Sequence, residues 1–234
     1  MAKAEAVKKP QGKAGAARAP VVHEEVFERL RRAIIAGQLE PGRALSVRGL
    51  ATQFGVSAMP AREAIRRLVA LNALELTPTR RVMVAQMSPG KIDEITEARI
   101  ALEPLIAARA LKAVGDDPCA REDLVTKLSA IDDELDEAIV QGDAESYSRL
   151  NSDFHFALYE TARAPVLLGL VESLWLQVGP FMRVVVGRLG TTALVDQHKE
   201  ALEALRAGDA RKLKSAVRLD ILEGMKNIRG ARLS

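Results

Sequence analysis

The hydrophobic pattern of this 234-residue chain keeps helical spacing almost throughout and changes to strand-like alternation in one short segment. After Asn72, in LELTPTRRVMVAQM, apolar and polar residues alternate on both sides of Pro78 and Thr79. Such alternation around a turn predicts a β-hairpin. The fold class is therefore predicted to be mainly α, with the hairpin separating one group of helices before it from a second group after it.

Three short helices are predicted before the hairpin. The first lies in VVHEEVFERLRRAIIAGQ and the second in ALSVRGLATQF, where Ser46 is a suitable N-cap. The third begins at Ser57, which can cap it, and its buried stripe is predicted to be Ala61, Ile65 and Leu68. Three helices followed by a hairpin is the order of a winged helix-turn-helix, whose third helix enters the major groove of DNA.

From Ser88 onward the pattern is entirely helical and predicts a bundle of about six helices. Two Gly-Asp pairs, at 142–143 and 208–209, each end one helix and cap the next. Pro104 and Pro180 are expected to bend or interrupt their helices. The predicted helices cover residues 89–113, 119–141, 144–161, 165–187, 191–207 and 210–228.

The charge is distributed unevenly along the chain. Residues 1–20 offer almost nothing to bury and are predicted to be a disordered basic tail. Residues 21–88 carry ten arginines and six acidic residues, a net charge of +4, whereas residues 89–234 carry nineteen basic and twenty-four acidic residues, a net charge of −5. A basic front predicts a polyanionic partner. The predicted domains are the tail at 1–20, a DNA-binding domain at 21–87, and an all-helical domain at 88–234, for which the family resemblance described below implies effector binding and dimerisation.

Several protein classes are disfavoured by simple features. No apolar run approaches the roughly 20 residues that cross a bilayer, and the N-terminus has no apolar core of a signal peptide. The single cysteine, Cys119, cannot form an intramolecular disulfide. We therefore expect a cytoplasmic protein with no membrane partner.

Residues 28–84 strongly resemble the DNA-binding domain of the GntR superfamily of bacterial transcription regulators. The elements IIAGQLEPG and GVSAMPAREA carry this likeness. Arg48 and Arg62 match positions at which relatives use arginine to contact guanine, a task suited to the bidentate geometry of that side chain. An ordinary solvated basic helix is the alternative. The predicted DNA-contacting residues are Arg48, Ser57, Met59, Arg62, Arg66, Arg80 and Arg81.

Two residues depart from the pattern of that superfamily. Ala58 stands where many relatives have another arginine that contacts bases, and Arg81 stands where the wing usually has glycine. The base preference is therefore expected to differ, and Arg80 with Arg81 would add a phosphate or minor-groove contact at the wing tip.

Two of the three histidines lie in the helical remainder, and Asn151 and His155 are four residues apart on one helix face. A lone histidine at such a place is more often a hydrogen-bonded core residue than a metal ligand. The phrases EARIALEPLIAARA, DFHFALYE and QHKEALEALRAGD resemble the helical effector (FCD) domain of the FadR branch, and six helices match its VanR-like subgroup. Many members of that branch hold a divalent metal.

The resemblance implies a metal site formed by Asn151, His155, His198 and Asp220. Asn151 and Asp220 depart from the commoner Asp and His. Two imidazoles, a carboxylate and an amide oxygen form a mixed nitrogen and oxygen set that suits Zn, Ni or Mn.

Two arginines are candidates for binding the effector. Arg99 matches an arginine that faces the effector cavity in relatives; its alternative is a pair with Glu103 on a solvated helix face. Arg183 follows Phe181 and Met182 in an apolar stretch and would supply a second cation for an anion, with simple surface exposure as the alternative.

The function predicted from these features is a ligand-responsive bacterial transcription regulator, most simply a repressor. It would bind a palindromic DNA operator as a homodimer and a small organic acid through the metal. No catalytic residues are assigned, because neither H-E-x-x-H nor a Ser, His and Asp set is found. A metal-dependent hydrolase and an architectural DNA binder without an effector are the alternatives.

Overall fold

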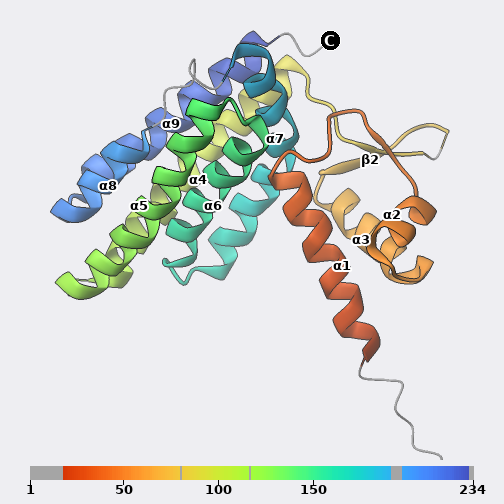
Figure 1. Ribbon diagram of the computed structural model, residues 1–234, viewed down its shortest axis with the longest axis horizontal. Coiled ribbons are helices and arrows are strands. Elements are labelled where there is room, and N and C mark those ends of the chain that lie inside the picture. The colour runs from red at the N-terminus through yellow and green to blue at the C-terminus, as the bar shows by residue number, and fades with distance from the viewer. Residues whose placement is uncertain (1–17, 80, 116, 191–196, 232–234) are drawn as a thin grey trace, which may run out of the picture.

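The computed structural model describes residues 18–79, 81–115, 117–190 and 197–231 (Figure 1). In these ranges the chain forms nine helices and three short strands, which confirms the mainly α fold class with a winged helix-turn-helix before a helical bundle. We call residues 18–87 the winged part and residues 88–231 the helical bundle. The winged part contains α1 (Arg18–Ile35), β1 (Ala44–Leu45), α2 (Val47–Phe54), α3 (Ala58–Ala70), β2 (Leu74–Leu76) and β3 (Val82–Val84).

The hairpin predicted from alternation forms, and it gains a third strand. β3 is central in the sheet, with β1 and β2 antiparallel on its two sides, and Leu74 lies opposite Val84. Both of these side chains are buried beneath the sheet. β1 was not predicted because two residues are too few to display an alternating pattern.

The tail prediction for residues 1–20 needs one correction. Residues 1–17 lie outside the described residues, but Arg18 already belongs to α1, so the helix begins before the predicted boundary. The predicted ends of α2 hold: Ser46 accepts a hydrogen bond from the Gly49 amide, and Gly55 adopts the left-handed conformation that ends the helix.

The helical bundle follows the predicted order of six helices. Neither proline interrupts its helix: Pro104 lies inside α4 and Pro180 inside α7. The start of the fifth predicted helix, residues 191–196, lies outside the described residues. The helices are α4 (Pro89–Val114), α5 (Pro118–Gln141), α6 (Ala144–Glu160), α7 (Pro165–Leu189), α8 (His198–Ala207) and α9 (Ala210–Gly230).

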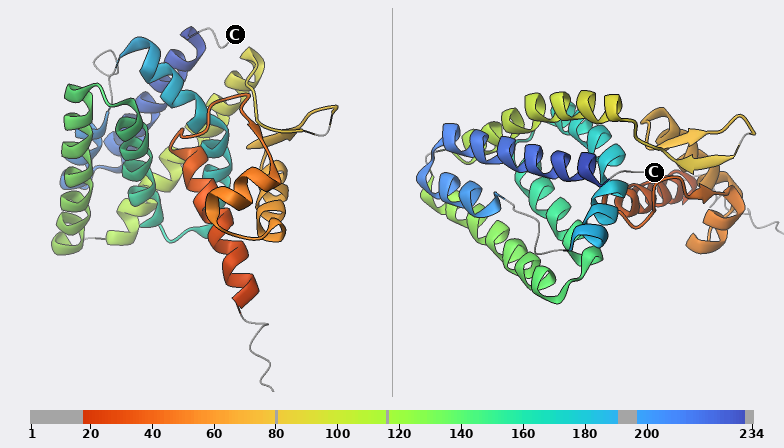
Figure 2. Two further views of the ribbon diagram at one scale, coloured as in Figure 1. Left: turned by 45° about the vertical axis from the view of Figure 1, so that its right-hand side comes forward. Right: turned by 90° about the horizontal axis from the view of Figure 1, so that it is seen from above.

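The winged part and the bundle meet through α1 and α7. Figure 2 shows the winged part at one end of the bundle, with α1 between the bundle and the smaller helices. The contact is unusually close: a Cβ atom added to Gly179 of α7 would lie 2.3 Å from the carbonyl oxygen of Ile35 in α1. An ion pair between Arg31 and Glu172, at 3.1 Å, joins the same two helices. Buried apolar side chains from both parts form one continuous core.

One described helix, α7, has the length and apolar composition of a membrane-crossing segment, because an 18-residue window within Pro165–Arg188 has a mean hydropathy of 1.3. The expectation that no run approaches this length is corrected here. α7 packs against α1, α4, α6 and α9, and Val171, Trp175 and Leu176 are buried among them. The apolar composition is therefore explained by its place in the core of the bundle.

Candidate functional site

The third helix of the winged part presents a polar and exposed face on the side opposite its core stripe. Ala61, Ile65 and Leu68 are buried as predicted, while Met59 is 64% exposed. Ser57 occupies the N-cap position, but its side chain forms no capping hydrogen bond to the helix. The hydroxyl of Ser57 is exposed and is available to a partner outside the chain.

The four arginines of α2 and α3 differ in their contacts. Arg67 is structural, because it pairs with Glu24 at 2.7 Å and stacks on Phe27 at 3.5 Å. Arg66 pairs with Glu63 at 2.7 Å yet keeps 76% of its side chain exposed. Arg48 and Arg62 are exposed and form no ion pair among the described residues. These last two side chains are therefore open to phosphate or base contacts.

The wing turn joins β2 and β3 through residues 77–81. The Arg81 amide donates to the hydroxyl of Thr77 at 3.0 Å, and the Thr77 amide donates to the Arg81 carbonyl at 2.9 Å. Arg81 is exposed at this turn, while Arg80 lies outside the described residues.

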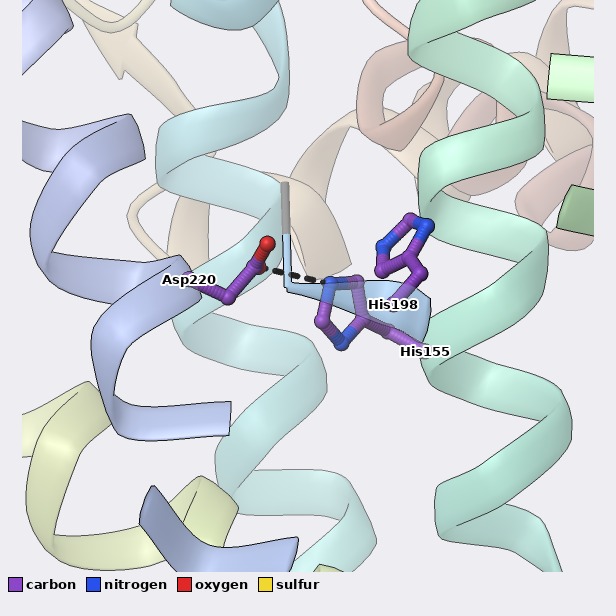
Figure 3. Close-up of side chains that lie close together, drawn as sticks. All are labelled: His155, His198 and Asp220. Carbon is purple, nitrogen blue, oxygen red and sulfur yellow. Dashed lines mark ion pairs between the residues drawn. The ribbon is translucent and has the colours of Figure 1, made fainter. Parts of the chain in front are cut away.

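Three of the four predicted metal ligands converge in the centre of the bundle. Figure 3 shows His155, His198 and Asp220, which come from α6, α8 and α9. Their possible ligand atoms all lie within 4.8 Å of one another. The rings of His155 and His198 are 1% exposed each, so the cluster is removed from bulk solvent. Asn151 lies one turn before His155 on α6 and lines a cavity beside Asp220.

Both histidine rings are held by partners on their Nδ1 atoms. His198 Nδ1 lies 3.1 Å from a carboxylate oxygen of Asp132, which is 3% exposed on α5. His155 Nδ1 lies 3.1 Å from the hydroxyl of Tyr159, and that hydroxyl donates to Glu103 at 2.8 Å. Burial, and then the charge of Glu103, raises the pKa of the Tyr159 hydroxyl well above its usual value. The phenol therefore stays protonated and donates to Glu103.

This network determines what His155 presents to Asp220. Because Tyr159 donates its only proton to Glu103, it can only accept from His155, which places a proton on Nδ1. In the neutral ring the other nitrogen, Nε2, then carries a lone pair. It is buried without a hydrogen bond of good geometry and lies 3.0 Å from Asp220 Oδ2. Two lone pairs at this distance repel one another, so a proton or a metal cation is needed between them.

The surroundings of Asp220 favour the charged form of its carboxyl group. Burial alone would raise the pKa of the Asp220 carboxyl, but the close approach of His155 and the charges of both histidines outweigh it. An amide of Gln197 also donates to Asp220 at 3.3 Å. The net effect holds the pKa of Asp220 well below its usual value, so the group is a carboxylate.

Arg99 and Glu103 form a buried ion pair beside this cluster. Arg99 Nε donates to Glu103 at 2.5 Å, and the guanidinium lies over the ring of Trp175 at 4.7 Å. Trp175 Nε1 also donates to Glu103 at 3.1 Å. The pairing expected for a solvated helix face does form, but the two side chains are 4% and 0% exposed, so it lies inside the bundle.

A small cavity joins the ion pair to the metal-ligand cluster. Its volume is about 20 Å³, and Arg99, Asn151, Trp175 and Asp220 contribute to its walls. A cavity needs roughly 10–15 Å³ to hold one water molecule. The described arrangement therefore has room for a single water-sized occupant beside Asp220.

Comparisons with known proteins agree with both parts. Residues 22–84 match the profile of the bacterial regulatory proteins of the gntR family, and residues 94–222 match that of the FCD domain. The chain is 30% identical over 188 residues to the HTH-type transcriptional regulator McbR of Escherichia coli K12, covering 79% of this chain and 82% of McbR. The chain belongs to the GntR family.

The FCD match places this GntR-family regulator in the FadR branch, and further relatives are regulators of the same kind. The gluconate operon transcriptional repressor of Bacillus subtilis is 27% identical over 190 residues, covering 77% of this chain and 74% of that protein. The solved structure of E. coli McbR superimposes with a TM-score of 0.79 at 26% identity, covering 88% of this chain and 96% of McbR. The full arrangement of winged part and bundle is thus shared with a solved relative.

Sequence reasoning missed three contributors to the centre of this GntR-family regulator. Asp132 supports His198, Tyr159 supports His155, and Trp175 lines the cavity, yet none was assigned a role. Asp132 carried one usable signal, because it lies at helical spacing between the buried Leu128 and Leu135. A carboxylate on a buried stripe requires a partner.

The structure separates Arg183 from the other predicted effector residue. Its side chain is 36% exposed and pairs with Glu145 at 3.3 Å. Arg183 lines a second pocket at the junction of the winged part and the bundle, whereas Arg99 lines the central cavity. The prediction that both arginines face one anion is therefore corrected.

Proposed function

We propose that this bacterial regulator acts in the cytoplasm as a homodimeric repressor that binds a palindromic operator and is controlled by a small carboxylate. The exposed face of α3 carries the DNA-binding proposal, because Arg62 and Arg48 are not engaged by carboxylates. A helix-turn-helix reads one half-site, so two copies match a two-fold operator. The described part of the wing adds Arg81 as a phosphate contact.

We further propose that the bundle holds a divalent metal through His155, His198 and Asp220, with Asn151 as the fourth ligand. The convergence of three ligand side chains, whose ligand atoms lie within 4.8 Å of one another, is the observation that carries this proposal. A mixed set of imidazole, carboxylate and amide suits Zn, Ni or Mn. The bound cation would supply positive charge and open coordination positions to a carboxylate.

The cavity indicates how an effector would act. An organic acid is larger than the roughly 20 Å³ available, so its binding requires the cavity walls to move apart. Such a ligand binds the wider arrangement better than the described one and therefore shifts the population toward it. Arg99 lies in the wall and would face the carboxylate together with the metal.

The metal proposal is tested by thermal unfolding of the full chain after chelation, with and without added Zn²⁺, Ni²⁺ or Mn²⁺. A ligand at about 100 times its dissociation constant stabilises a protein by roughly 2.7 kcal/mol. We expect this stabilisation in the wild type and in His23→Ala, a histidine control outside the centre, and its loss in Asp220→Asn. An equal metal response in Asp220→Asn would refute the ligand set.

The effector is sought with the same assay, using small carboxylates with and without metal. A hit that requires the metal identifies the chemical class of the inducer. If metal binds but no carboxylate stabilises the protein, the metal is structural and the effector proposal fails.

The DNA-binding proposal is tested by selecting duplex sequences that bind wild type and Arg62→Ala. We expect Arg62→Ala to weaken the specific site by about 1–3 kcal/mol and to relax the base preference. Arg109→Ala, an exposed arginine of the bundle, serves as the matched control. An unchanged preference in Arg62→Ala would place the reading helix elsewhere, and no sequence preference in the wild type would favour an architectural DNA binder.

We infer that the chain is not an enzyme, since relatives that match it over most of their length are transcription regulators. No observation in the described residues favours a hydrolase over a regulator.

A further inference from the structure

A second pocket, much larger than the central cavity, lies where the winged part meets the bundle. Its volume is about 620 Å³, within the roughly 300–1,000 Å³ typical of small-molecule sites. Gln86 and Met87 of the winged part form one wall, and Phe181, Val184 and Arg183 of α7 form another. We call it the junction pocket. Its lining residues differ from those of the central cavity, although α6 and α7 contribute to the walls of both.

The walls of the junction pocket combine apolar surface with positive charge. Phe181 and Met87 are 2% and 8% exposed, and Val184 lies beside them. Arg183 and Arg188 supply two guanidinium groups to the lining and Glu40 supplies one carboxylate, while Glu145, outside the lining, pairs with Arg183. We propose that the junction pocket binds an amphipathic organic anion, with an apolar body against Val184 and an acidic group on Arg183.

The contacts of Arg183 fit this role. Its ion pair with Glu145 spans 3.3 Å and is 36% and 50% exposed at the two side chains. Exposed pairs of this kind contribute little, so an anionic ligand can replace Glu145 at small cost. Arg188 is positioned beside it by donating to the Ala231 carbonyl at 2.6 Å.

The position of the pocket gives its occupant a regulatory consequence. A Cβ atom added to Gly37, at the end of α1, would lie 2.8 Å from Cβ of Arg183. Arg183 therefore lies where the winged part packs against the helical bundle. A ligand that touches both walls binds best to one relative placement of the two parts and so favours it.

The test uses the fluorescent anion anilinonaphthalene sulfonate, which has the proposed amphipathic chemistry. Gly187 lines the pocket, and no atom lies within 4 Å of a Cβ built there, so Gly187→Leu narrows the pocket from an open position. Gly169 is an equally open glycine of the same helix outside the pocket, and Gly169→Leu is the matched control. The full-length protein is titrated in each case.

We expect saturable binding of one dye per chain in the wild type and in Gly169→Leu, and weaker binding in Gly187→Leu. Arg183→Gln should weaken binding by about tenfold, as expected for loss of a hydrogen bond to a charged group. Absence of saturable binding in the wild type, or wild-type binding by Gly187→Leu, would overturn the proposal. Repeating the titration with chelator and with Zn²⁺ separates this site from the metal centre, because dye binding should persist when metal is removed.

Discussion

Replacing Gly179 by alanine tests whether the backbones of α1 and α7 are in direct contact. In an exposed helix interior this change stabilises a protein by about 0.5–1 kcal/mol, because glycine loses more backbone freedom on folding. At Gly179 the added methyl group would lie 2.3 Å from the Ile35 carbonyl oxygen and 2.7 Å from that of Ile34. These are backbone atoms, so the clash is relieved only if the two helices separate. We therefore expect a change of opposite sign.

Overpacking of a fitted contact costs about 1–3 kcal/mol, which exceeds the propensity gain. For a chain of this size, each kcal/mol corresponds to roughly 2–4 °C in the melting temperature. Calorimetry should thus show a lower melting temperature for Gly179→Ala and a higher one for Gly169→Ala, whose site is open on the same helix. If both variants gain stability equally, the close contact between α1 and α7 is refuted.

Three further predictions concern the centre and the tail. Glu103→Gln leaves the buried guanidinium of Arg99 without a carboxylate, so unfolding should require about 3–5 kcal/mol less, and a wild-type melting curve would contradict the role of this pair. Asp132→Asn should weaken metal binding by about 10–100-fold, because Asp132 orients the ring of His198. A chelator competition assay measures this affinity, and an unchanged value would show that Asp132 does not support His198 as a ligand. Deleting residues 1–17, with four lysines and one glutamate, should weaken binding to every duplex and flatten its salt dependence, whereas an unchanged salt slope would exclude phosphate contacts.

The sequence was a good guide to the secondary-structure elements and a poorer guide to the contacts between side chains. Apolar spacing and Gly-Asp boundaries located the helices, because these signals are local. The convergence of His155 and Asp220 was available only through resemblance, since the register between α6 and α9 is decided by packing. The same limit explains Asp132, whose partner His198 is sixty-six residues away. It also explains the wrong expectation for Arg183, because the apolar residues next to it in the sequence do not indicate which pocket it lines.

Three residues of α7 connect the centre of the bundle, the contact between α7 and α1, and the junction pocket. Trp175 donates to Glu103 in the centre, Gly179 contacts the carbonyl of Ile35, and Arg183 lines the junction pocket. These residues are spaced by four, so they occupy successive turns of one continuous helix. A ligand that widens the central cavity must displace its walls, and Trp175 is one of them. Because the backbone of Gly179 lies directly against α1, we expect a displacement of α7 to move α1, the first helix of the DNA-binding part.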